Sequence, residues 1–383
     1  MKDAEPSVIR EMLKLSLDPD YISFAGGDPD PSFFPVEQLL SFDQRIGNDE
    51  RILFQYSISE GNELLREQIV KYLKTIDIKA NLENIIITTG GQQGLDLTGK
   101  VFIEEDDAIA VEGPTYMGAI NAFRQYLPSF DSVEMDEEGI SVNKLNENFE
   151  GGRDYKFIYV IPDFQNPTGK SMSYRRRKEL LEFAEKYDLL IIEDSPYYSL
   201  RFQGEQLPAI KSMDENDNVI YIGSFSKMIC PANRIGWVCA SDEIIEKYVI
   251  AKQAADIHSN ELSQLQTANY LKNYSLKDHM KLINSKYKEK KDTMINAIRK
   301  YFPECVEYTE PEGGLFVWLT LPKEWVGEDI MKQCLHEKVT IVPGSRFYAN
   351  DSKLNNIRLS FATMDVDMIE EGIRRMGKLL RSY

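Results

Sequence analysis

The sequence contains only four cysteines and three histidines, and it has no long apolar run. The cysteines are too few and too widely separated for a disulfide framework or a zinc ribbon, which indicates reduced thiols. The histidines show no metal-ligand spacing, so we expect no metal site. No stretch approaches the ~20 apolar residues that a membrane-spanning helix needs. Disulfide scaffolds, metal-stabilised folds and integral membrane proteins are therefore excluded.

Positive charge is also scarce, because 45 Lys and Arg face 62 Asp and Glu for a formal net charge of −17. Such a surface repels nucleic acid and anionic membranes, so neither is an expected partner, and an anionic ligand needs a local basic cluster. The one basic run, Arg175 to Lys178, opens an amphipathic helical pattern, and we interpret it as a solvated face. The chain starts with Asp, Glu and Pro rather than a signal peptide, so we expect a cytoplasmic protein.

Short β-rich runs alternate with helical segments through the first two thirds of the chain. The runs are residues 85–90, 108–112, 157–161, 189–193, 219–223 and 234–239. They are apolar throughout rather than alternating, which is typical of central strands covered on both faces. We therefore expect an α/β fold with a large domain over residues 46–275, whose mostly parallel sheet, of a seven-stranded type, lies between helices. Ligands of such folds bind beyond the carboxyl ends of the strands.

The last third follows a different pattern. A long polar helix is expected over about residues 276–301, followed by the run Phe316-Val-Trp318 after two glycines and by a final helix. We interpret Phe316 and Trp318 as core residues. This part is expected to form a smaller α+β domain over residues 276–383. The N-terminal segment, residues 1–45, lacks a core of its own and is expected to pack with it.

One lysine stands where imine chemistry needs it. Lys227 follows a strand directly, two serines flank it at positions 224 and 226, and Arg234 lies seven residues on. A lysine at such a place can be desolvated and kept partly neutral, as imine formation requires. The serine hydroxyls and the guanidinium could bind a phosphate. For the lysine by itself, an ordinary surface position is an equally good interpretation.

The segment around Lys227 resembles the S-x-S-K motif, followed by an arginine, of fold type I pyridoxal-phosphate aminotransferases of class I and II. Further matches come in the same chain order and cover nearly the whole chain. They are Thr89–Gly94, Glu112-Gly-Pro-Thr-Tyr116, Asn166-Pro-Thr-Gly169, Asp194-x-x-Tyr197 and Ile357-Arg-Leu-Ser360. Each piece has an ordinary alternative, such as a tight turn, a loop or a strand cap. The combination is what is specific.

The resemblance implies pyridoxal phosphate as the cofactor, held covalently by Lys227. Asp194 is expected to pair with the pyridine nitrogen and to keep it protonated, so that the ring accepts electrons. Asn166 and Tyr197 are expected to hydrogen-bond the phenolic oxygen, and Tyr116 is expected to stack on the ring. The expected phosphate ligands are the backbone amides of Gly91 and Gln92, which begin a helix, and Ser224, Ser226 and Arg234.

The resemblance also implies substrate and subunit contacts. Arg358 is expected to bind the α-carboxylate of the substrate with its planar fork, together with Asn166, and Gly27 is expected beside it. An arginine inside an apolar run is costly unless it is paired, which favours a function there. Tyr56 matches a tyrosine that reaches the phosphate of the neighbouring subunit, so we expect a homodimer with shared active sites.

The activity implied is transfer of an amino group from an L-amino acid to a 2-oxo acid such as 2-oxoglutarate, with Lys227 moving the α-proton as base and then acid. Two alternatives stay open. A β-lyase or decarboxylase can use the same fold, and so can the ligand-sensing module of a regulator. We give the regulator little weight, because no basic helix-turn-helix segment precedes the catalytic part.

The spelling of residues 162–169 and of Ile9-Arg-Glu-Met-Leu13 most resembles the aminoadipate, kynurenine and aromatic branch of the family. Aminoadipate or glutamate, aromatic and aliphatic amino acids are therefore the expected donors. In that branch an arginine in a matching stretch meets the distal end of the substrate, which assigns this role to Arg10. The alternative is an ordinary exposed arginine on a helix over residues 7–17.

Overall fold

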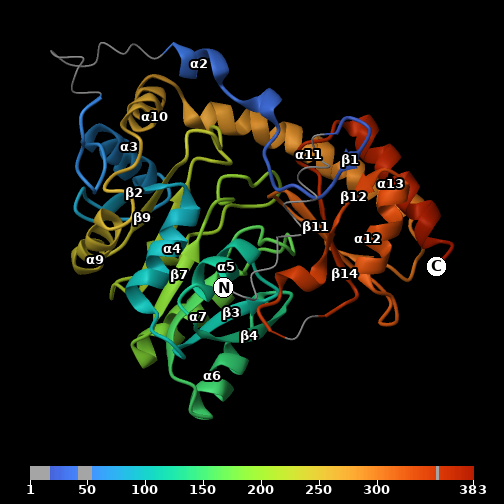
Figure 1. Cartoon of the computed structure of the whole chain (residues 1–383), viewed down its shortest axis with the longest axis horizontal. Helices are drawn as coiled ribbons and strands as arrows, with labels where there is room; N and C mark the ends of the chain where they lie inside the picture. The colour runs from blue at the N-terminus through green and yellow to red at the C-terminus, as the bar shows by residue number, and fades with distance from the viewer. Residues whose placement is uncertain (1–17, 42–53, 351–352) are drawn as a thin grey trace.

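The computed structural model describes residues 18–41, 54–350 and 353–383, and its centre is a mixed sheet (Figure 1). The eight strands run in the order β2-β9-β8-β7-β6-β3-β4-β5. Strands β8, β7, β6, β3 and β4 are parallel to one another. Strand β9 is antiparallel to both β8 and β2, and β5 is antiparallel to β4. The bounds are β2 (Ile85–Thr89), β3 (Ala108–Gly113), β4 (Ser129–Asp136), β5 (Gly139–Ile140), β6 (Tyr155–Val160), β7 (Leu190–Asp194), β8 (Val219–Ser224) and β9 (Ile235–Cys239). The expected α/β fold is confirmed, with eight strands in place of seven.

Helices cover this sheet, which is why its central strands are apolar. Every residue of β8 and β9 is buried. Helix α4 packs against β2, β8 and β9, and α7 packs against β7. The helices of this part are α3 (Glu63–Lys74), α4 (Gly91–Phe102), α5 (Met117–Arg124), α6 (Val142–Glu150), α7 (Tyr174–Tyr187), α8 (Ile210–Met213), α9 (Asp242–Gln253) and α10 (Glu261–Asn273).

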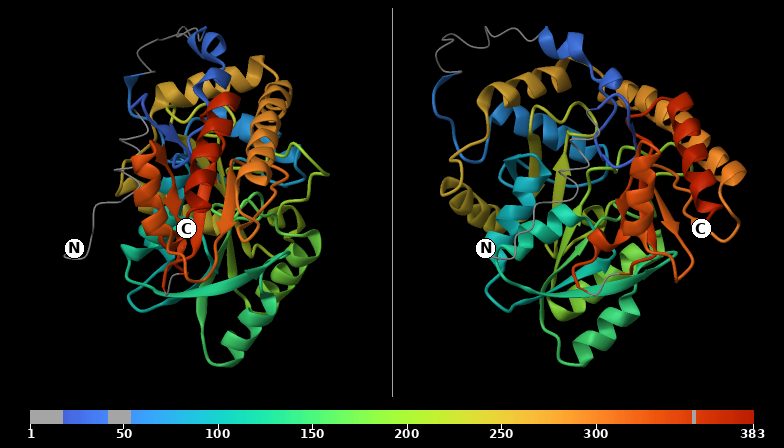
Figure 2. Two further views of the ribbon diagram at one scale, coloured as in Figure 1. Left: turned by 90° about the vertical axis from the view of Figure 1, so that its right-hand side faces the viewer. Right: turned by 45° about the vertical axis from the view of Figure 1, so that its right-hand side comes forward.

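The C-terminal part has a second, antiparallel sheet with the order β10-β11-β14-β13. Its helices gather on one side of the molecule, in orange and red in Figure 2. Near the N-terminus, β1 (Ile22–Ser23) pairs with β12 (Val339–Thr340), so this segment lies against the C-terminal part. The remaining elements are η1 (Pro31–Phe33), α2 (Val36–Leu40), α11 (Leu276–Tyr301), β10 (Glu307–Tyr308), β11 (Phe316–Thr320), α12 (Gly327–His336), β13 (Val342–Pro343), η3 (Gly344–Phe347), β14 (Asn356–Ser360) and α13 (Val366–Leu380). Domain boundaries near residues 45 and 275 stay a proposal. Within the described ranges, no helix combines the length and the apolar character that crossing a membrane requires.

The sheet brings the segments with chemical side chains to one edge. Strand β2 is antiparallel to β9, and β9 is antiparallel to β8, so β2 runs in the same direction as the parallel strands. The chain therefore leaves β2, β3, β6, β7 and β8 at the same edge of the sheet. These exits lead to Gly91, Tyr116, Asn166, Asp194 and Lys227.

The basic run at the start of α7 corrects one of our interpretations. Arg175 and Lys178 are exposed, but Arg176 and Arg177 are buried, so the solvated-face interpretation is wrong for these two. Arg177 is fully buried and forms an ion pair with Asp163 at 2.8 Å. Its position explains why: Arg177 lies three, four and seven residues before the apolar Leu180, Leu181 and Ala184, on the face that packs against the sheet.

The Arg177–Asp163 pair yields a stability prediction. Arg177→Met should lower the free energy of unfolding by about 3–5 kcal/mol, because the Asp163 carboxylate would stay buried without a partner. Arg175→Met, on the exposed position two residues before it, should change the same quantity by less than about 1 kcal/mol. Urea denaturation of both variants measures the difference, and similar losses for the two would contradict the buried pairing.

Candidate active site

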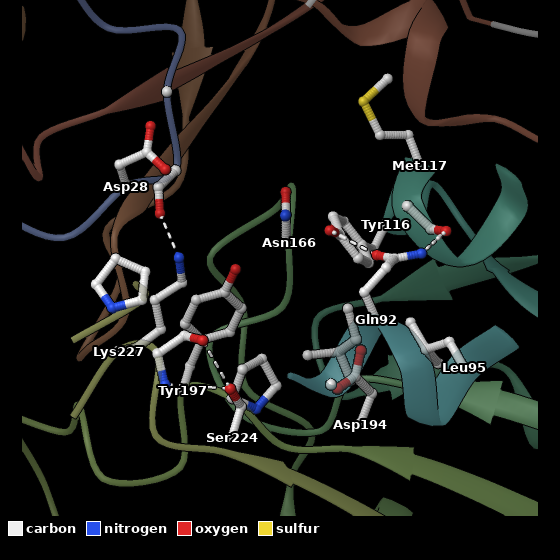
Figure 3. A pocket seen from close by; sticks show the side chains of 18 of the residues that line it. Asp28, Gln92, Leu95, Tyr116, Met117, Asn166, Asp194, Tyr197, Ser224 and Lys227 are labelled. Carbon is white, nitrogen blue, oxygen red and sulfur yellow. Dashed lines mark hydrogen bonds between the residues drawn. The ribbon is translucent and has the colours of Figure 1, made fainter. Parts of the chain in front are cut away.

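A cavity of about 390 Å³ lies where the strand exits of the large sheet meet the N-terminal segment and β14 (Figure 3). Its wall includes the predicted site residues Gly27, Gly91, Gln92, Tyr116, Asn166, Asp194, Tyr197, Ser224, Ser226, Lys227, Arg234 and Arg358. Figure 3 shows Lys227 and Asp28 on one side of the pocket and Gln92, Tyr116 and Met117 on the other. In the part of the chain that the structure describes, no group of three or more His, Cys, Asp or Glu could hold a metal ion.

Lys227 follows the end of β8 and points into the pocket. Its Nζ donates a hydrogen bond to the carbonyl oxygen of Gly27 at 2.8 Å. Burial lowers the pKa of Lys227 to about 8; the negative charge of Asp28 opposes the shift, and the guanidinium groups of Arg234 and Arg358 add to it. Burial thus favours the unprotonated amine, which is the form that attacks a carbonyl group.

The start of α4 forms an anion site with the segment around Lys227. Gly90 precedes the helix with φ 73° and supplies no side-chain cap, and the first helical residues, Gly91 and Gln92, line the pocket. The left-handed backbone of Gly90 favours glycine, and a Cβ atom there would also displace the Arg234 guanidinium, 2.4 Å away. Ser224 donates from its hydroxyl to the Ser226 hydroxyl at 3.0 Å. Hydroxyls, free amides and a guanidinium together match the needs of a phosphate.

Asp194, the last residue of β7, is a buried carboxylate in the pocket wall. Its Oδ2 accepts a hydrogen bond from the Tyr159 hydroxyl at 2.7 Å. Burial raises the pKa of Asp194 to about 7, and the hydrogen bond from Tyr159 opposes this shift. Among the described residues, Asp194 has no ion-pair partner, so the site suits a cationic or proton-bearing ligand atom. Tyr159 was not among the predicted residues, because its pairing with Asp194 arises only when β6 and β7 are neighbours.

Arg358, in β14, is a buried cation in the opposite wall. One guanidinium nitrogen donates to Asn166 Oδ1 at 2.9 Å, and the other donates to the Ala25 carbonyl oxygen. The rings of Phe316 and Phe347 lie 4.4 and 4.9 Å from its Cζ. Burial lowers the pKa of Arg358 to about 10. No carboxylate of the described residues forms an ion pair with it, and its Nε has no hydrogen-bond partner among them. A buried cation in this state favours binding of an anion such as a carboxylate.

Two tyrosines form further parts of the wall. Tyr116 donates to Gln92 Oε1 at 3.3 Å, and Gln92 donates to the Gly118 carbonyl oxygen at 2.8 Å. Tyr197 is buried and contacts the edge of Phe316, with ring centroids 5.8 Å apart. Phe316, which we interpreted as a core residue, is therefore both buried and part of the support for Tyr197 and Arg358.

One predicted site residue is not part of this cavity, and another has no described position. Tyr56 is 78% exposed and lies outside the pocket wall of its own chain, with its ring edge-on to His258 at 5.9 Å. Arg10 lies outside the described residues. Conversely, the wall contains Asp28, which was not predicted although it directly follows Gly27.

Comparison with known proteins agrees with this geometry. Residues 20–376 match the model of the family described as aminotransferase class I and II. The chain is 39% identical to aromatic-amino-acid aminotransferase 1 of Thermococcus litoralis, over 98% of this chain and 91% of that protein. It is also 39% identical to 2-aminoadipate transaminase of Thermus thermophilus, over 98% and 94%. The structure superposes on kynurenine aminotransferase of Pyrococcus horikoshii with a TM-score of 0.95 and 38% identity, covering 100% of this chain and 96% of that one. The chain belongs to the aminotransferase class I and II family.

Proposed function

We propose that the protein is a pyridoxal-phosphate-dependent aminotransferase that moves the amino group of an L-amino acid to a 2-oxo acid such as 2-oxoglutarate. The observation that carries this proposal is the arrangement of three charges in one cavity. An amine of lowered pKa (Lys227), a buried carboxylate (Asp194) and a buried guanidinium without a carboxylate partner (Arg358) all line it.

The residues of the cavity fit the cofactor. The uncapped start of α4, the hydroxyls of Ser224 and Ser226, and Arg234 suit its phosphate. The buried Asp194 suits the protonated pyridine nitrogen, and Lys227 suits the aldehyde carbon. Asn166 and Tyr197, whose side chains interact with each other, suit the phenolic oxygen. Tyr116, across the pocket from Lys227, suits the face of the ring (Figure 3).

When bound, pyridoxal phosphate supplies a carbonyl group that condenses with amines and a ring that accepts electrons from the substrate carbon. Lys227 would hold the cofactor between turnovers, and its free amine would take the α-proton of the substrate and later return a proton. The lowered pKa of Lys227 suits both steps, since the same group must act as base and then as acid near neutral pH. Asp194 would pair with the ring nitrogen and stabilise its positive charge.

Arg358 binds the α-carboxylate of the substrate throughout both halves of the reaction. Its guanidinium is held by Asn166 and by the Ala25 carbonyl oxygen, and two aromatic rings flank it. A planar guanidinium fixed in this way would hold the substrate with its α-carbon toward Lys227. Part of the binding energy of the carboxylate would thus serve to orient the reacting atoms. The segment that contains Gly27 contacts both groups, because the Gly27 carbonyl oxygen accepts from Lys227 and the Ala25 carbonyl oxygen accepts from Arg358.

The donors that we propose are aminoadipate or glutamate, aromatic and aliphatic amino acids. The similar proteins named above are called aromatic-amino-acid, 2-aminoadipate and kynurenine aminotransferases, which supports the aminoadipate and aromatic donors. We propose that Arg10 pairs with the distal carboxylate of acidic donors.

We also propose a cytoplasmic location, which the free thiols of all four cysteines support.

A panel of amino donors with 2-oxoglutarate tests the activity. Each accepted donor should yield its 2-oxo acid and an equal amount of glutamate, which coupled assays and chromatography measure. Release of ammonia and pyruvate without glutamate would instead indicate a lyase on the same fold. Protein that turns over no donor of the three classes would contradict the proposal.

Lys227 should hold the cofactor, so borohydride reduction of the yellow protein should attach the label to Lys227 in peptide maps. In protein freed of cofactor, competitive acetylation should show Lys227 becoming reactive with a midpoint near pH 8, because burial favours its neutral form. Lys144, exposed and with a pKa raised by Glu147, is the control and should stay less reactive at that pH. A label on another lysine, or equal midpoints, would contradict the assignment.

We propose that the protein is a homodimer in which Tyr56 binds the phosphate in the partner's site, which its exposure outside its own pocket supports. Tyr56→Ala and Lys227→Ala should each be nearly inactive. Refolding the two variants together should restore roughly a quarter of wild-type activity, because half of randomly mixed dimers contain one complete site. If Tyr56 acted within its own chain, no mixed dimer would have a complete site, and the mixture would stay inactive.

A further inference from the structure

Behind the pocket wall lies a buried carboxyl group that the reaction described above does not use. Glu112, in β3, is 1% exposed and is not part of the wall. Its Oε2 accepts two hydrogen bonds at 3.1 Å, from the backbone N–H of Ile161 and from Gln165 Nε2. Its Oε1 is buried and has no hydrogen-bond partner among the described residues. Both donors belong to the segment that follows β6.

Gln165 extends this contact into a small network. Its Nε2 also donates to the Pro114 carbonyl oxygen at 2.7 Å. Its Oε1 accepts from the backbone N–H and the hydroxyl of Thr168, at 3.0 and 2.7 Å. The side chains of Glu112 and Gln165 therefore join the chain leaving β3 to the turn after β6. The next residue in that turn is Asn166, whose Oδ1 accepts from Arg358 at 2.9 Å.

Burial favours the neutral form of the Glu112 carboxyl. Burial raises its pKa to about 8; the hydrogen bonds from Gln165 and Ile161 oppose the shift, and the negative charge of Asp194 adds to it. In the neutral form Oε2 is the carbonyl oxygen that accepts both N–H groups, and the proton resides on Oε1. A carboxamide has the same shape and the same acceptor, so glutamine at this position preserves both hydrogen bonds.

We propose that Glu112 is a positioning residue for the substrate carboxylate: through Gln165 and Ile161 it fixes the turn that presents Asn166 to Arg358. This role rests on the proposed function, in which Arg358 binds the α-carboxylate. Without the Glu112 acceptor, the N–H of Ile161 loses its partner inside the protein, and the Asn166 turn shifts to find another. Arg358 then loses the group that aims its fork at the substrate, and misplacement by about 1 Å costs up to ~100-fold in rate.

Glu112→Ala and Glu112→Gln test the proposal together. In Glu112→Ala, kcat/KM for an accepted donor should fall about ten- to a hundredfold, chiefly through a higher KM. The Kd of glutarate, an unreactive carboxylate, should rise in the same variant by calorimetry. Glu112→Gln should restore both quantities to within about threefold of wild type. Losses as large in Glu112→Gln, or an unchanged KM and Kd in Glu112→Ala, would overturn the proposal.

Glu193 offers a matched control in the neighbouring part of the sheet. It is fully buried in β7, its pKa is raised to about 7 chiefly by burial, and it accepts from the N–H groups of Ile210 and Lys211 at 3.0 and 2.8 Å. Those donors begin α8, which lies outside the pocket wall. Glu193→Ala should lower the melting temperature without changing KM or the Kd of glutarate. Equal rises of KM in the Glu193 and Glu112 variants would show that Glu112 only stabilises the fold, and would overturn the positioning role.

A second variant covers the case in which Glu112→Ala does not fold. Gln165→Met keeps the volume and removes the donor to Glu112, and it should raise KM and the Kd of glutarate in the same way. Combining it with Glu112→Ala, if that variant folds, should add little to the larger single effect, because both substitutions break one contact. Additive losses would overturn the proposal. Wild-type protein that binds glutarate but forms no glutamate would contradict the aminotransferase function alone, and the Kd comparison would still decide the role of Glu112.

Discussion

The rest of the site depends on one interaction, the burial of the Arg358 guanidinium without a carboxylate partner among the described residues. A cation in a protein interior is costly unless polar or aromatic groups replace its water. Four groups replace the water around Arg358. They are the amide oxygen of Asn166 in the turn after β6, the carbonyl oxygen of Ala25 in the N-terminal segment, and the rings of Phe316 and Phe347 in the C-terminal part. Three distant parts of the chain must therefore meet at Arg358, and the place where they meet is the active-site cavity.

The same physical cause acts on the other charged groups of the pocket. Burial lowers the pKa of Lys227 to about 8 and raises that of Asp194 to about 7. Desolvation disfavours both charged forms, so a base and an acid that would normally be far apart in pKa come within about one unit of each other. A fold that excludes water from the strand exits thus brings the titration of both groups close to neutral pH.

The sequence predicted those features that depend on local pattern. Runs apolar along their length gave the strands β2, β3, β6, β7, β8 and β9, because a strand covered on both faces has no polar side. Strand β4 was missed: only part of Ser129–Asp136 is buried, since it pairs with β3 along its length but with β5 only at its end. Arg177 was misread because charge was given more weight than its place on the apolar stripe of α7.

The candidate site residues could be predicted where they belong to short sequence motifs in the turns that follow strands. The residues that hold these turns were not, because their contacts join positions far apart in sequence. Glu112 reaches Ile161 and Gln165 across 49 and 53 positions, and Tyr159 reaches Asp194 across 35. A polar residue in an apolar strand, such as Glu112, does indicate that a long-range contact exists. A buried carboxyl group without a hydrogen-bond partner would destabilise the fold.

This division also explains why the class of reaction is easier to infer than the donor. In the proposed function, Lys227, Asp194 and Arg358 act on the amine, the cofactor ring and the α-carboxylate. Every amino-acid substrate has the same amine and α-carboxylate. The side chain of the donor meets other parts of the wall, and these differ in polarity. Met117 is apolar, Asn121 is a neutral amide and Asp28 is an exposed carboxylate beside Lys227. The part of the wall outside the proposed catalytic groups therefore combines apolar, neutral polar and charged side chains. Such a mixture supports the proposal that the pocket accepts donors of several kinds.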